Sequence, residues 1–162
     1  MRALMVVGAA VIVVLAAGGC TNGRPDGPSP VKSVDKADYS KPGPVDADAP
    51  EEFTQTSSGL KYRIRRKGTG RRPTAADSVL ASYKGWLDDG KEFDSSYKRG
   101  EPTPFPLSGV IPGWTEGLQH VSEGGMIELE IPAELGYGAA GQPPDIPPNA
   151  RLHFLVELHE VR

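Results

Sequence analysis

Apolar and polar residues alternate along several short stretches after residue 53, as they do in half-buried β-strands. Such stretches cover residues 60–64, 79–83 and 127–131, and a shorter one covers 105–107. The most regular stretch covers residues 152–158. The turn signal Asp-Asp-Gly at 88–90 follows the second stretch and predicts a β-hairpin whose second strand begins near residue 91.

One short helix is predicted between these strands. Pro112 suits a first helical turn, because the N–H that proline lacks has no partner there in any helix. Trp114, Leu118 and Val121 follow at helical spacing on one face, and the glycine pair at 124–125 ends the segment. Consecutive strands with a helix on one face predict an α+β domain built on an antiparallel sheet.

The first nineteen residues have the pattern of a secretory signal peptide. Arg2 precedes an uncharged, mostly apolar run from Ala3 to Ala17, and small residues then lead to Cys20. The run is short for a permanent membrane-spanning helix, which needs about 20 apolar residues. We therefore expect residues 1–19 to be a signal peptide and the protein to be exported to the extracytoplasmic face of a bacterial cell membrane.

Cys20 is the only cysteine of the chain, so an intramolecular disulfide is excluded. The segment 17–20, Ala-Gly-Gly-Cys, resembles a bacterial lipobox, although Ala17 stands where that signal usually has leucine. The resemblance implies that Cys20 carries fatty acyl chains such as palmitate and anchors the protein to the membrane. One chain binds a membrane only marginally, whereas lipoproteins carry two or three. The alternatives are an ordinary signal peptide and an uncleaved anchor.

Residues 21–52 are rich in proline and in small or charged residues, and almost no large apolar residue occurs among them. A segment of this composition buries too little surface to offset the entropy lost on ordering. We therefore predict a lipidated cysteine and a disordered linker over residues 20–52, followed by one folded domain over 53–162. The alternative for the linker is an extended arm packed on the domain.

Six motifs in the predicted domain occur in a characteristic order and spacing. They are Tyr-Lys-Gly at 83–85, Gly-Lys-Glu-Phe-Asp-Ser-Ser at 90–96, Val-Ile-Pro-Gly-Trp at 110–114, Gly-Tyr-Gly-Ala at 136–139, Ile-Pro-Pro-Asn-Ala at 146–150 and Leu-His-Phe-Leu-Val-Glu-Leu at 152–158. Together they resemble the FKBP family of peptidyl-prolyl cis-trans isomerases over about residues 57–162. The resemblance implies a twisted antiparallel sheet of five or six strands wrapped around one short helix.

The family's pocket lies between helix and sheet, and its residues are carried over position by position. The resemblance implies a floor from Trp114, walls from Tyr83, Phe93 and Phe154, and polar contacts from Asp94 and Tyr137. Further substrate contacts are implied for Val110, Ile111 and Ile146, with the Ile111 N–H holding a substrate carbonyl. Taken singly, each of these residues reads as an ordinary core, strand or turn residue, and only the shared spacing indicates a site.

Such a pocket suits rotation about an Xaa-Pro bond. The barrier of about 18–20 kcal/mol comes from amide resonance, which makes the planar bond polar. A dry, apolar pocket disfavours that planar form and favours the twisted one, so no metal or nucleophile is required. We expect the Asp94 carboxylate to pair with Tyr83 or with a nearby arginine and to interact with the twisted bond.

Two positions depart from the family pattern at the pocket rim. Thr103 aligns where many members have a second phenylalanine, with Phe105 two residues further on, and Gln142 stands where many have histidine. Both changes affect the expected affinity for FK506-like macrolides and the preference for substrate sequence more than the expected activity.

Other ligand classes are not indicated. Acidic and basic residues are mixed along the chain at a net charge of −3, so nucleic acid is not expected. His153 and His159 share strand parity with Glu157, and His120 lies elsewhere, but no zinc spacing occurs and we predict neither metal nor cofactor. We expect a monomer that acts on Xaa-Pro-containing polypeptides.

Three functions remain open from the sequence. The first is an isomerase that assists exported proteins in folding, and the presence of all the aromatic pocket residues favours it. The second is a catalytically weak peptide-binding or chaperone module, although no long insertion stands between residues 102 and 110, where some members carry a chaperone flap. The third is an inert structural lipoprotein, which would have no need of the pocket residues.

Overall fold

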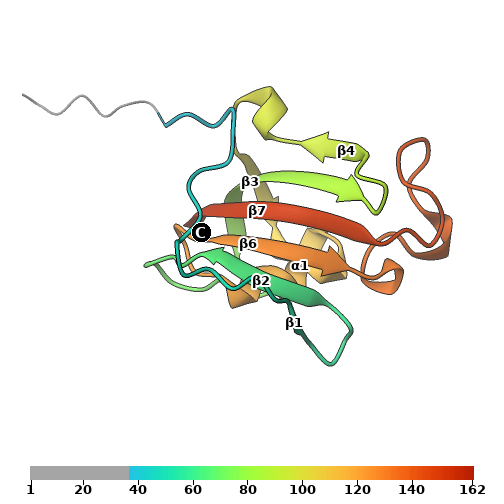
Figure 1. Ribbon diagram of the computed structural model, residues 1–162, viewed down its shortest axis with the longest axis horizontal. Coiled ribbons are helices and arrows are strands. Elements are labelled where there is room, and N and C mark those ends of the chain that lie inside the picture. The colour runs from blue at the N-terminus through green and yellow to red at the C-terminus, as the bar shows by residue number, and fades with distance from the viewer. Residues whose placement is uncertain (1–36) are drawn as a thin grey trace, which may run out of the picture. The chain divides into compact units, whose positions relative to one another are not determined.

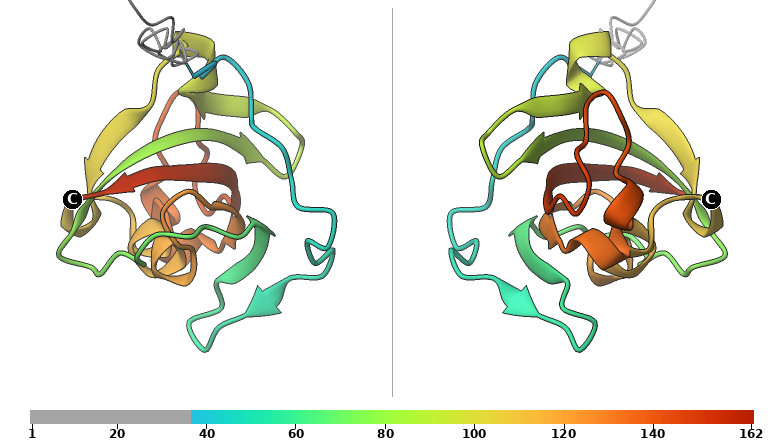
Figure 2. Two further views of the ribbon diagram at one scale, coloured as in Figure 1. Left: turned by 90° about the vertical axis from the view of Figure 1, so that its left-hand side faces the viewer. Right: turned by 90° about the vertical axis from the view of Figure 1, so that its right-hand side faces the viewer.

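A strongly curved antiparallel sheet forms the framework of the protein (Figures 1 and 2). The computed structural model describes residues 37–162, and seven strands occur among them. The strands are β1 (Thr54–Gln55), β2 (Lys61–Arg66), β3 (Ser78–Leu87), β4 (Glu92–Ser95), β5 (Thr103–Pro106), β6 (Met126–Ile131) and β7 (Leu152–Val161). Their order in the sheet is β1-β2-β6-β7-β3-β4, and β5 also pairs with β3.

The two longest strands, β3 and β7, pair at the centre of the sheet from Val79 opposite Val161 to Leu87 opposite Leu152. The register shifts between Leu80 and Ala81, and a bulge of this kind increases the local twist of a sheet. On its other edge, β3 pairs with β5 from Ser78 opposite Pro106 to Ala81 opposite Thr103, and with β4 further along. One strand therefore contacts three others, and the sheet curves around the helix (Figure 2).

The helix α1 (Pro112–Gly117) packs on the concave face of the sheet. Gly113 and Gly117 lie one turn apart and face β6. A Cβ atom at Gly113 would lie 2.5 Å from a side-chain carbon of Ile131, and one at Gly117 would lie 2.7 Å from a side-chain carbon of Leu129. The absence of side chains at both glycines thus brings the helix backbone against the strand. Trp114 points into the core between them and is 4% exposed.

Short 3-10 turns complete the fold. They are η1 (Tyr97–Arg99), η2 (Leu107–Gly109), η3 (Leu118–His120), η4 (Ala133–Leu135) and η5 (Gly138–Ala140). The helix predicted to run on from Pro112 past Leu118 is therefore a six-residue α-helix that tightens into η3, although Leu118 and Val121 are buried as predicted. The core lies between α1 and the sheet, and its largest members include Leu60, Leu107, Leu118, Ile127, Leu129, Ile131, Leu152, Val156 and Leu158.

The predicted fold class is confirmed: an antiparallel sheet wraps around one short helix. The sheet has seven strands among the described residues rather than five or six, because the two-residue strand β1 and the short strands β4 and β5 all join it. The predicted hairpin between β3 and β4 is present, with Gly90 at a φ of 82° in the turn. Within residues 37–162, no helix has the length and hydropathy needed to cross a membrane.

Residues 37–52, here called the arm, differ from the prediction. The arm lies against the face of the sheet opposite α1 instead of forming part of a disordered linker (Figure 2). The amide of Asp46 donates to the carbonyl of Arg65 at 2.8 Å. Arginines of β2 donate to carbonyl oxygens of the arm: Arg63 to Glu51, Arg65 to Pro50 and Arg66 to Pro44. The folded unit therefore begins before residue 53, and the signal peptide, Cys20 and the linker up to residue 36 lie outside the described residues.

The arm is held by polar contacts, which explains why its composition suggested disorder. Glu157 of β7 lies beneath it with 7% of its side chain exposed, accepts the amide N–H of Gly43 and pairs with Arg66 at 3.3 Å. A Cβ atom at Gly43 would lie 2.8 Å from the Arg66 guanidinium, so the arm approaches as closely as glycine allows. Tyr39 packs edge-on against His159, whose pKa is lowered by burial.

Replacing Glu157 tests whether the arm is part of the folded unit. Glu157→Gln removes the negative charge that pairs with Arg66 and weakens the bond from Gly43. A hydrogen bond to a buried charged group contributes about 1.5–3 kcal/mol, so we expect the free energy of unfolding to fall by about that amount. Urea denaturation followed by circular dichroism measures it.

Glu160→Gln is the matched control, because Glu160 is 48% exposed and, among residues 37–162, pairs with Arg162 alone. Exposed pairs contribute between about 0 and 1 kcal/mol. In a chain that begins at residue 53, the effect of Glu157→Gln should shrink, since the arm is gone. Equal effects of Glu157→Gln in the long and short chains would show that the arm does not depend on Glu157.

Candidate functional site

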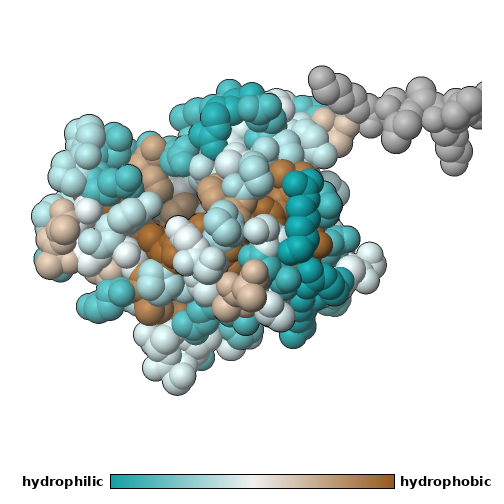
Figure 3. Space-filling view, turned by 180° about the vertical axis from the view of Figure 1, so that it is seen from behind, coloured by the Kyte–Doolittle hydropathy of each residue, from teal (hydrophilic) through white to brown (hydrophobic). Residues whose placement is uncertain are grey.

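A cavity of about 500 Å³ opens on the concave side of the sheet, between α1 and the segments that follow β4 and β6. Viewed from behind the sheet, apolar residues gather in a patch that polar residues surround (Figure 3). The residues that line the cavity are Tyr83, Phe93, Asp94, Phe105, Gly109, Val110, Ile111, Trp114, Tyr137, Gln142, Pro143, Asp145, Ile146 and Phe154.

Trp114 forms the centre of an aromatic cluster in this cavity. Its ring packs edge-to-face against Tyr83 at 5.3 Å, Phe105 at 5.1 Å and Phe154 at 5.3 Å between ring centroids. Each such pair contributes about 0.5–1.5 kcal/mol beyond the burial of its area. The cluster holds the indole of Trp114 fixed, and its N–H is buried without a hydrogen-bond partner among residues 37–162.

Gly85 of β3 makes room for the second aromatic wall. A Cβ atom at this position would lie 2.6 Å from ring carbons of both Phe93 and Phe154. These two rings pack edge-to-face at 5.4 Å, so the strand lies directly behind them. A side chain at Gly85 would displace both rings toward the cavity.

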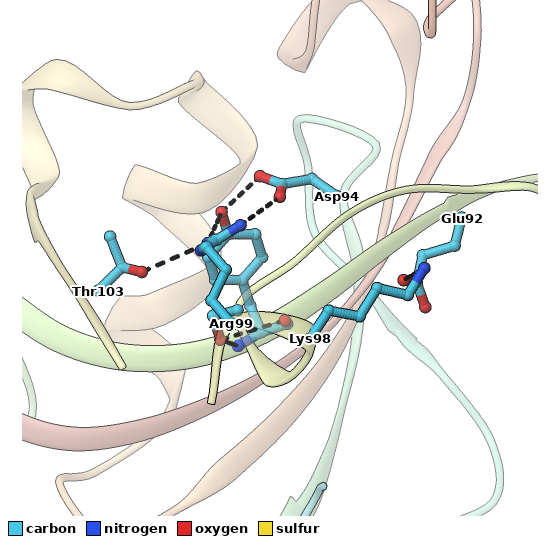
Figure 4. Close-up of polar contacts among 7 residues, drawn as sticks. Glu92, Asp94, Lys98, Arg99 and Thr103 are labelled. Atoms are coloured by element: carbon cyan, nitrogen blue, oxygen red, sulfur yellow. Dashed lines mark hydrogen bonds and ion pairs between the residues drawn. The ribbon is translucent and has the colours of Figure 1, made fainter. Parts of the chain in front are cut away.

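Asp94 is the charged group nearest this aromatic cluster, and its partners are fixed. Its carboxylate accepts the hydroxyl of Tyr83 and pairs with the guanidinium of Arg99 at 2.8 Å (Figure 4). Arg99 also donates to the Tyr83 oxygen at 3.0 Å and to the hydroxyl of Thr103 at 3.4 Å. The carboxylate, the phenol and the guanidinium thus form a closed triangle on the cavity wall.

The triangle sets the protonation of its members. Burial alone would raise the pKa of Asp94, but hydrogen bonds from Tyr83 and Arg99 and the charge of Arg99 outweigh it and hold that pKa below its usual range. Burial, together with the Asp94 carboxylate, raises the pKa of Tyr83 to about 12. Burial and the Asp94 charge also raise the pKa of Tyr137, which therefore keeps its proton and can donate it in a hydrogen bond.

The segment after β6 covers one side of the cavity with a closed loop. Gln142 and Ile146 exchange backbone hydrogen bonds of 2.8 and 2.9 Å. Gly141, at a φ of 61°, packs so closely against the backbone of Pro147 that a Cβ atom would lie 2.6 Å from its carbonyl carbon. Ile146 is 3% exposed and anchors the loop in the core.

The structure brings together all nine pocket residues that the sequence predicted. Tyr83, Phe93, Asp94, Val110, Ile111, Trp114, Tyr137, Ile146 and Phe154 all line the one cavity. The predicted pairing of Asp94 with Tyr83 and an arginine is present, and the arginine is Arg99. Cys20 lies outside the described residues.

Sequence reasoning did not place Phe105 in the site. It aligned the family's second phenylalanine with Thr103, whose hydroxyl contacts Arg99 instead, while the ring of Phe105 packs edge-to-face on Tyr83 at 5.5 Å. Because residues alternate along β5, a shift of two positions keeps Phe105 on the same face as Thr103. That parity is the signal that could have identified Phe105.

The three histidines have separate partners. His153 contacts Asp88 at 2.7 Å, His159 contacts Ser82 at 2.8 Å, and His120 stacks on a tyrosine ring of β2 at 4.2 Å. Among residues 37–162, no group of histidine, cysteine and acidic side chains is arranged to hold a metal ion.

Comparison with known proteins agrees with this geometry. A family model described as FKBP-type peptidyl-prolyl cis-trans isomerase matches residues 69–159. The chain is 56% identical over 115 residues to the FKBP-type peptidyl-prolyl cis-trans isomerase FkpA of Escherichia coli K12, covering 70% of this chain and 42% of that protein. It is 50% identical over 111 residues to a probable isomerase of the same type from Haemophilus influenzae, covering 68% and 46%. The chain thus spans less than half the length of these curated relatives.

Solved structures show the same likeness. The crystal structure of FkpA from Escherichia coli superposes with a TM-score of 0.67 at 53% identity, over 70% of this chain and 53% of that one. AtFKBP13 superposes with a TM-score of 0.64 at 35% identity, over 68% of this chain and 99% of that one. With the family model matching more than half of the sequence, the chain belongs to the FKBP-type peptidyl-prolyl cis-trans isomerase family.

Proposed function

We propose that this protein catalyses cis-trans isomerisation of Xaa-Pro bonds in polypeptides. The observation that carries the proposal is the aromatic cavity around Trp114, whose wall carries an ionised carboxylate held by a tyrosine and an arginine. None of the described residues that line it is a serine, cysteine, lysine or histidine. The cavity suits a reaction that is accelerated by apolar surroundings and a fixed charge rather than by a nucleophile.

The environment acts on amide resonance. A planar Xaa-Pro amide carries charge separation between oxygen and nitrogen, and twisting the bond reduces it. The aromatic walls exclude water. The polar planar state is stabilised by water more than the less polar twisted state is, so transfer into the cavity lowers the barrier between them. The proline ring would occupy the floor formed by Trp114, while the Tyr137 hydroxyl and the Ile111 N–H would hold the flanking carbonyls.

Asp94 contributes a fixed charge to this environment. Because its pKa is lowered, the carboxylate stays ionised, and because Arg99 and Tyr83 hold it, it needs no reorganisation during the reaction. It would interact favourably with the twisted bond, in which the imide nitrogen becomes pyramidal. FK506-like macrolides, which the family binds, would compete for the same cavity.

The same proposal places the protein outside the cytoplasm. The signal-like residues 1–19 and the small residues before Cys20 support export and lipid anchoring at the extracytoplasmic face of a bacterial membrane. The isomerase would then act on exported polypeptides as they fold.

Replacing Asp94 tests the activity and the site together. We expect the whole chain in nonionic detergent to accelerate cis-to-trans exchange in a short Xaa-Pro peptide. Asp94→Leu should reduce kcat/KM on the order of threefold to tenfold, a loss of up to about 1.4 kcal/mol in transition-state stabilisation. Glu134→Leu, a change of an exposed acid away from the cavity, should leave kcat/KM unchanged.

Circular dichroism of each variant confirms that it is folded. Full activity in folded Asp94→Leu would show that the Asp94 carboxylate has no part in catalysis. A folded wild-type chain that does not accelerate exchange but still binds the peptide would favour the alternative function, a peptide-binding or chaperone module.

The pH dependence tests the protonation of the triangle. Asp94 has a lowered pKa and Tyr83 one of about 12, so kcat/KM should stay level from about pH 5 to about pH 9. Activity should fall only as Asp94 gains a proton, below its usual pKa of 3.8. Arg99→Met removes a hydrogen bond and a positive charge that lower the pKa of Asp94, so the loss of activity on acidification should begin at higher pH.

A pH-rate profile of wild type and Arg99→Met, measured in buffers of constant ionic strength, decides the point. An acid limb at the same pH in both proteins, or a limb between pH 6 and 8 in the wild type, would contradict the assigned protonation states.

Lipid anchoring is tested at Cys20. When the whole chain is expressed in a bacterium, labelled palmitate should enter the wild-type protein, which should fractionate with membranes. Cys20→Ser should abolish both, whereas Ala17→Leu, which introduces the usual lipobox residue, should preserve both. Membrane association of an unlabelled Cys20→Ser protein would instead indicate an uncleaved anchor, and release of an unlabelled wild type would indicate an ordinary signal peptide.

A further inference from the structure

The charged residues that line the cavity are both acidic. Of its fourteen lining residues, only Asp94 and Asp145 carry a carboxyl group, and none of the described residues in the lining is a lysine or an arginine. The charge of Asp94 is compensated by Arg99 at 2.8 Å. Asp145 is therefore the lining residue whose charge remains to be accounted for.

Asp145 is held in place by its loop. It directly precedes Ile146, which is 3% exposed and anchored in the core. The backbone hydrogen bonds between Gln142 and Ile146 close the loop on both sides of Asp145. The backbone of Asp145 is thus held at the rim of the cavity, while 59% of its side chain is exposed.

The nearest described cation to Asp145 compensates it weakly. The ammonium of Lys91, in the turn between β3 and β4, lies 3.9 Å from the carboxylate, which is too far for a hydrogen bond. Both side chains are more than half exposed. A pair of this kind exchanges readily with water and with other ions, so a cation on a bound polypeptide can replace Lys91.

We propose that Asp145 makes the isomerase selective for polypeptides that carry lysine or arginine next to the proline. This inference rests on the proposed function, in which the proline ring fills the apolar floor. The residues on either side of that proline must then leave across the rim, where a cationic side chain approaches Asp145 and an acidic one is repelled. Long, flexible lysine and arginine side chains can reach the carboxylate while the backbone stays in the cavity.

The size of the preference follows from the exposure of the carboxylate. An exposed charge pair changes a binding constant by a factor of about 1.4 to 5. The lysine peptide gains this factor by attraction and the glutamate peptide loses it by repulsion, so we expect a ratio of about twofold to 25-fold between them at low ionic strength. The ratio should approach one in about 0.5 M salt, because exposed charges are then screened.

The test uses the whole chain in nonionic detergent and two peptide series, Ala-Xaa-Pro-Phe and Ala-Ala-Pro-Xaa, with lysine, leucine or glutamate as Xaa. The kcat/KM and the Kd of each peptide are measured, the Kd by calorimetry. Wild type should prefer lysine over glutamate in at least one series. Asp145→Asn should bring the ratio to about one, and Asp145→Lys should reverse it.

Asp48→Asn is the matched control, because it makes the same change of charge at an exposed residue of the arm, on the other face of the sheet. It should keep the lysine preference, and wild type and Asp48→Asn should turn over the leucine peptide equally. A lysine-to-glutamate ratio of one in both series, or a preference that survives Asp145→Asn, overturns the inference. Absence of exchange on every peptide would overturn the proposed activity instead, while the Kd ratio would still decide the role of Asp145.

Discussion

The edge-to-face packing of aromatic rings around Trp114 is the interaction on which the site depends. It links helix α1 to three strands, because Tyr83 belongs to β3, Phe105 to β5 and Phe154 to β7. The rings can meet only because the backbones behind them approach closely. Gly117 brings the helix against β6, and Gly85 leaves space behind the wall. The cavity is what remains when large rings are held at the edges of a close-packed core.

An ionised carboxylate beside such a cavity requires compensation, since an isolated charge there would gain a proton instead. Arg99 and Tyr83 supply that compensation from the 3-10 turn η1 and from β3, so the carboxylate stays ionised on the cavity wall although only 44% of its side chain is exposed. The apolar surfaces and the fixed charge are therefore not in conflict. In the proposed reaction the apolar surfaces would make the planar amide less favourable, and the fixed charge would provide a field that is already oriented when the bond twists.

The features that could be predicted from the sequence are those that leave a local pattern. Alternation identified the long strands, and Pro112 marked the start of the helix. The nine pocket residues came from a set of spacings shared with a family, since each residue alone would read as core. The register bulge in β3 and the closure of the loop at Gln142 involve pairs that lie far apart or have no periodicity, and the sequence carried no signal for them.

The arm shows most clearly where composition misleads. Its sequence has few large apolar residues. That composition predicts disorder when a segment can be stabilised only by burying apolar surface. Here the carbonyl oxygens of the arm meet arginines that point outward from β2, and a buried glutamate of β7 accepts the Gly43 amide. Neither segment shows the interaction by itself, because β2 alone reads as a charged strand face and the arm alone reads as a linker.

Packing of the arm also constrains the lipoprotein proposed above. Between Cys20 and the first described residue, Ala37, there are sixteen residues, which can span at most about 55 Å when fully extended. A tether that ran to residue 52 would have twice as many. The arm lies on the face of the sheet opposite α1, whereas the cavity opens on the side of α1. The arm itself therefore does not cross the cavity entrance.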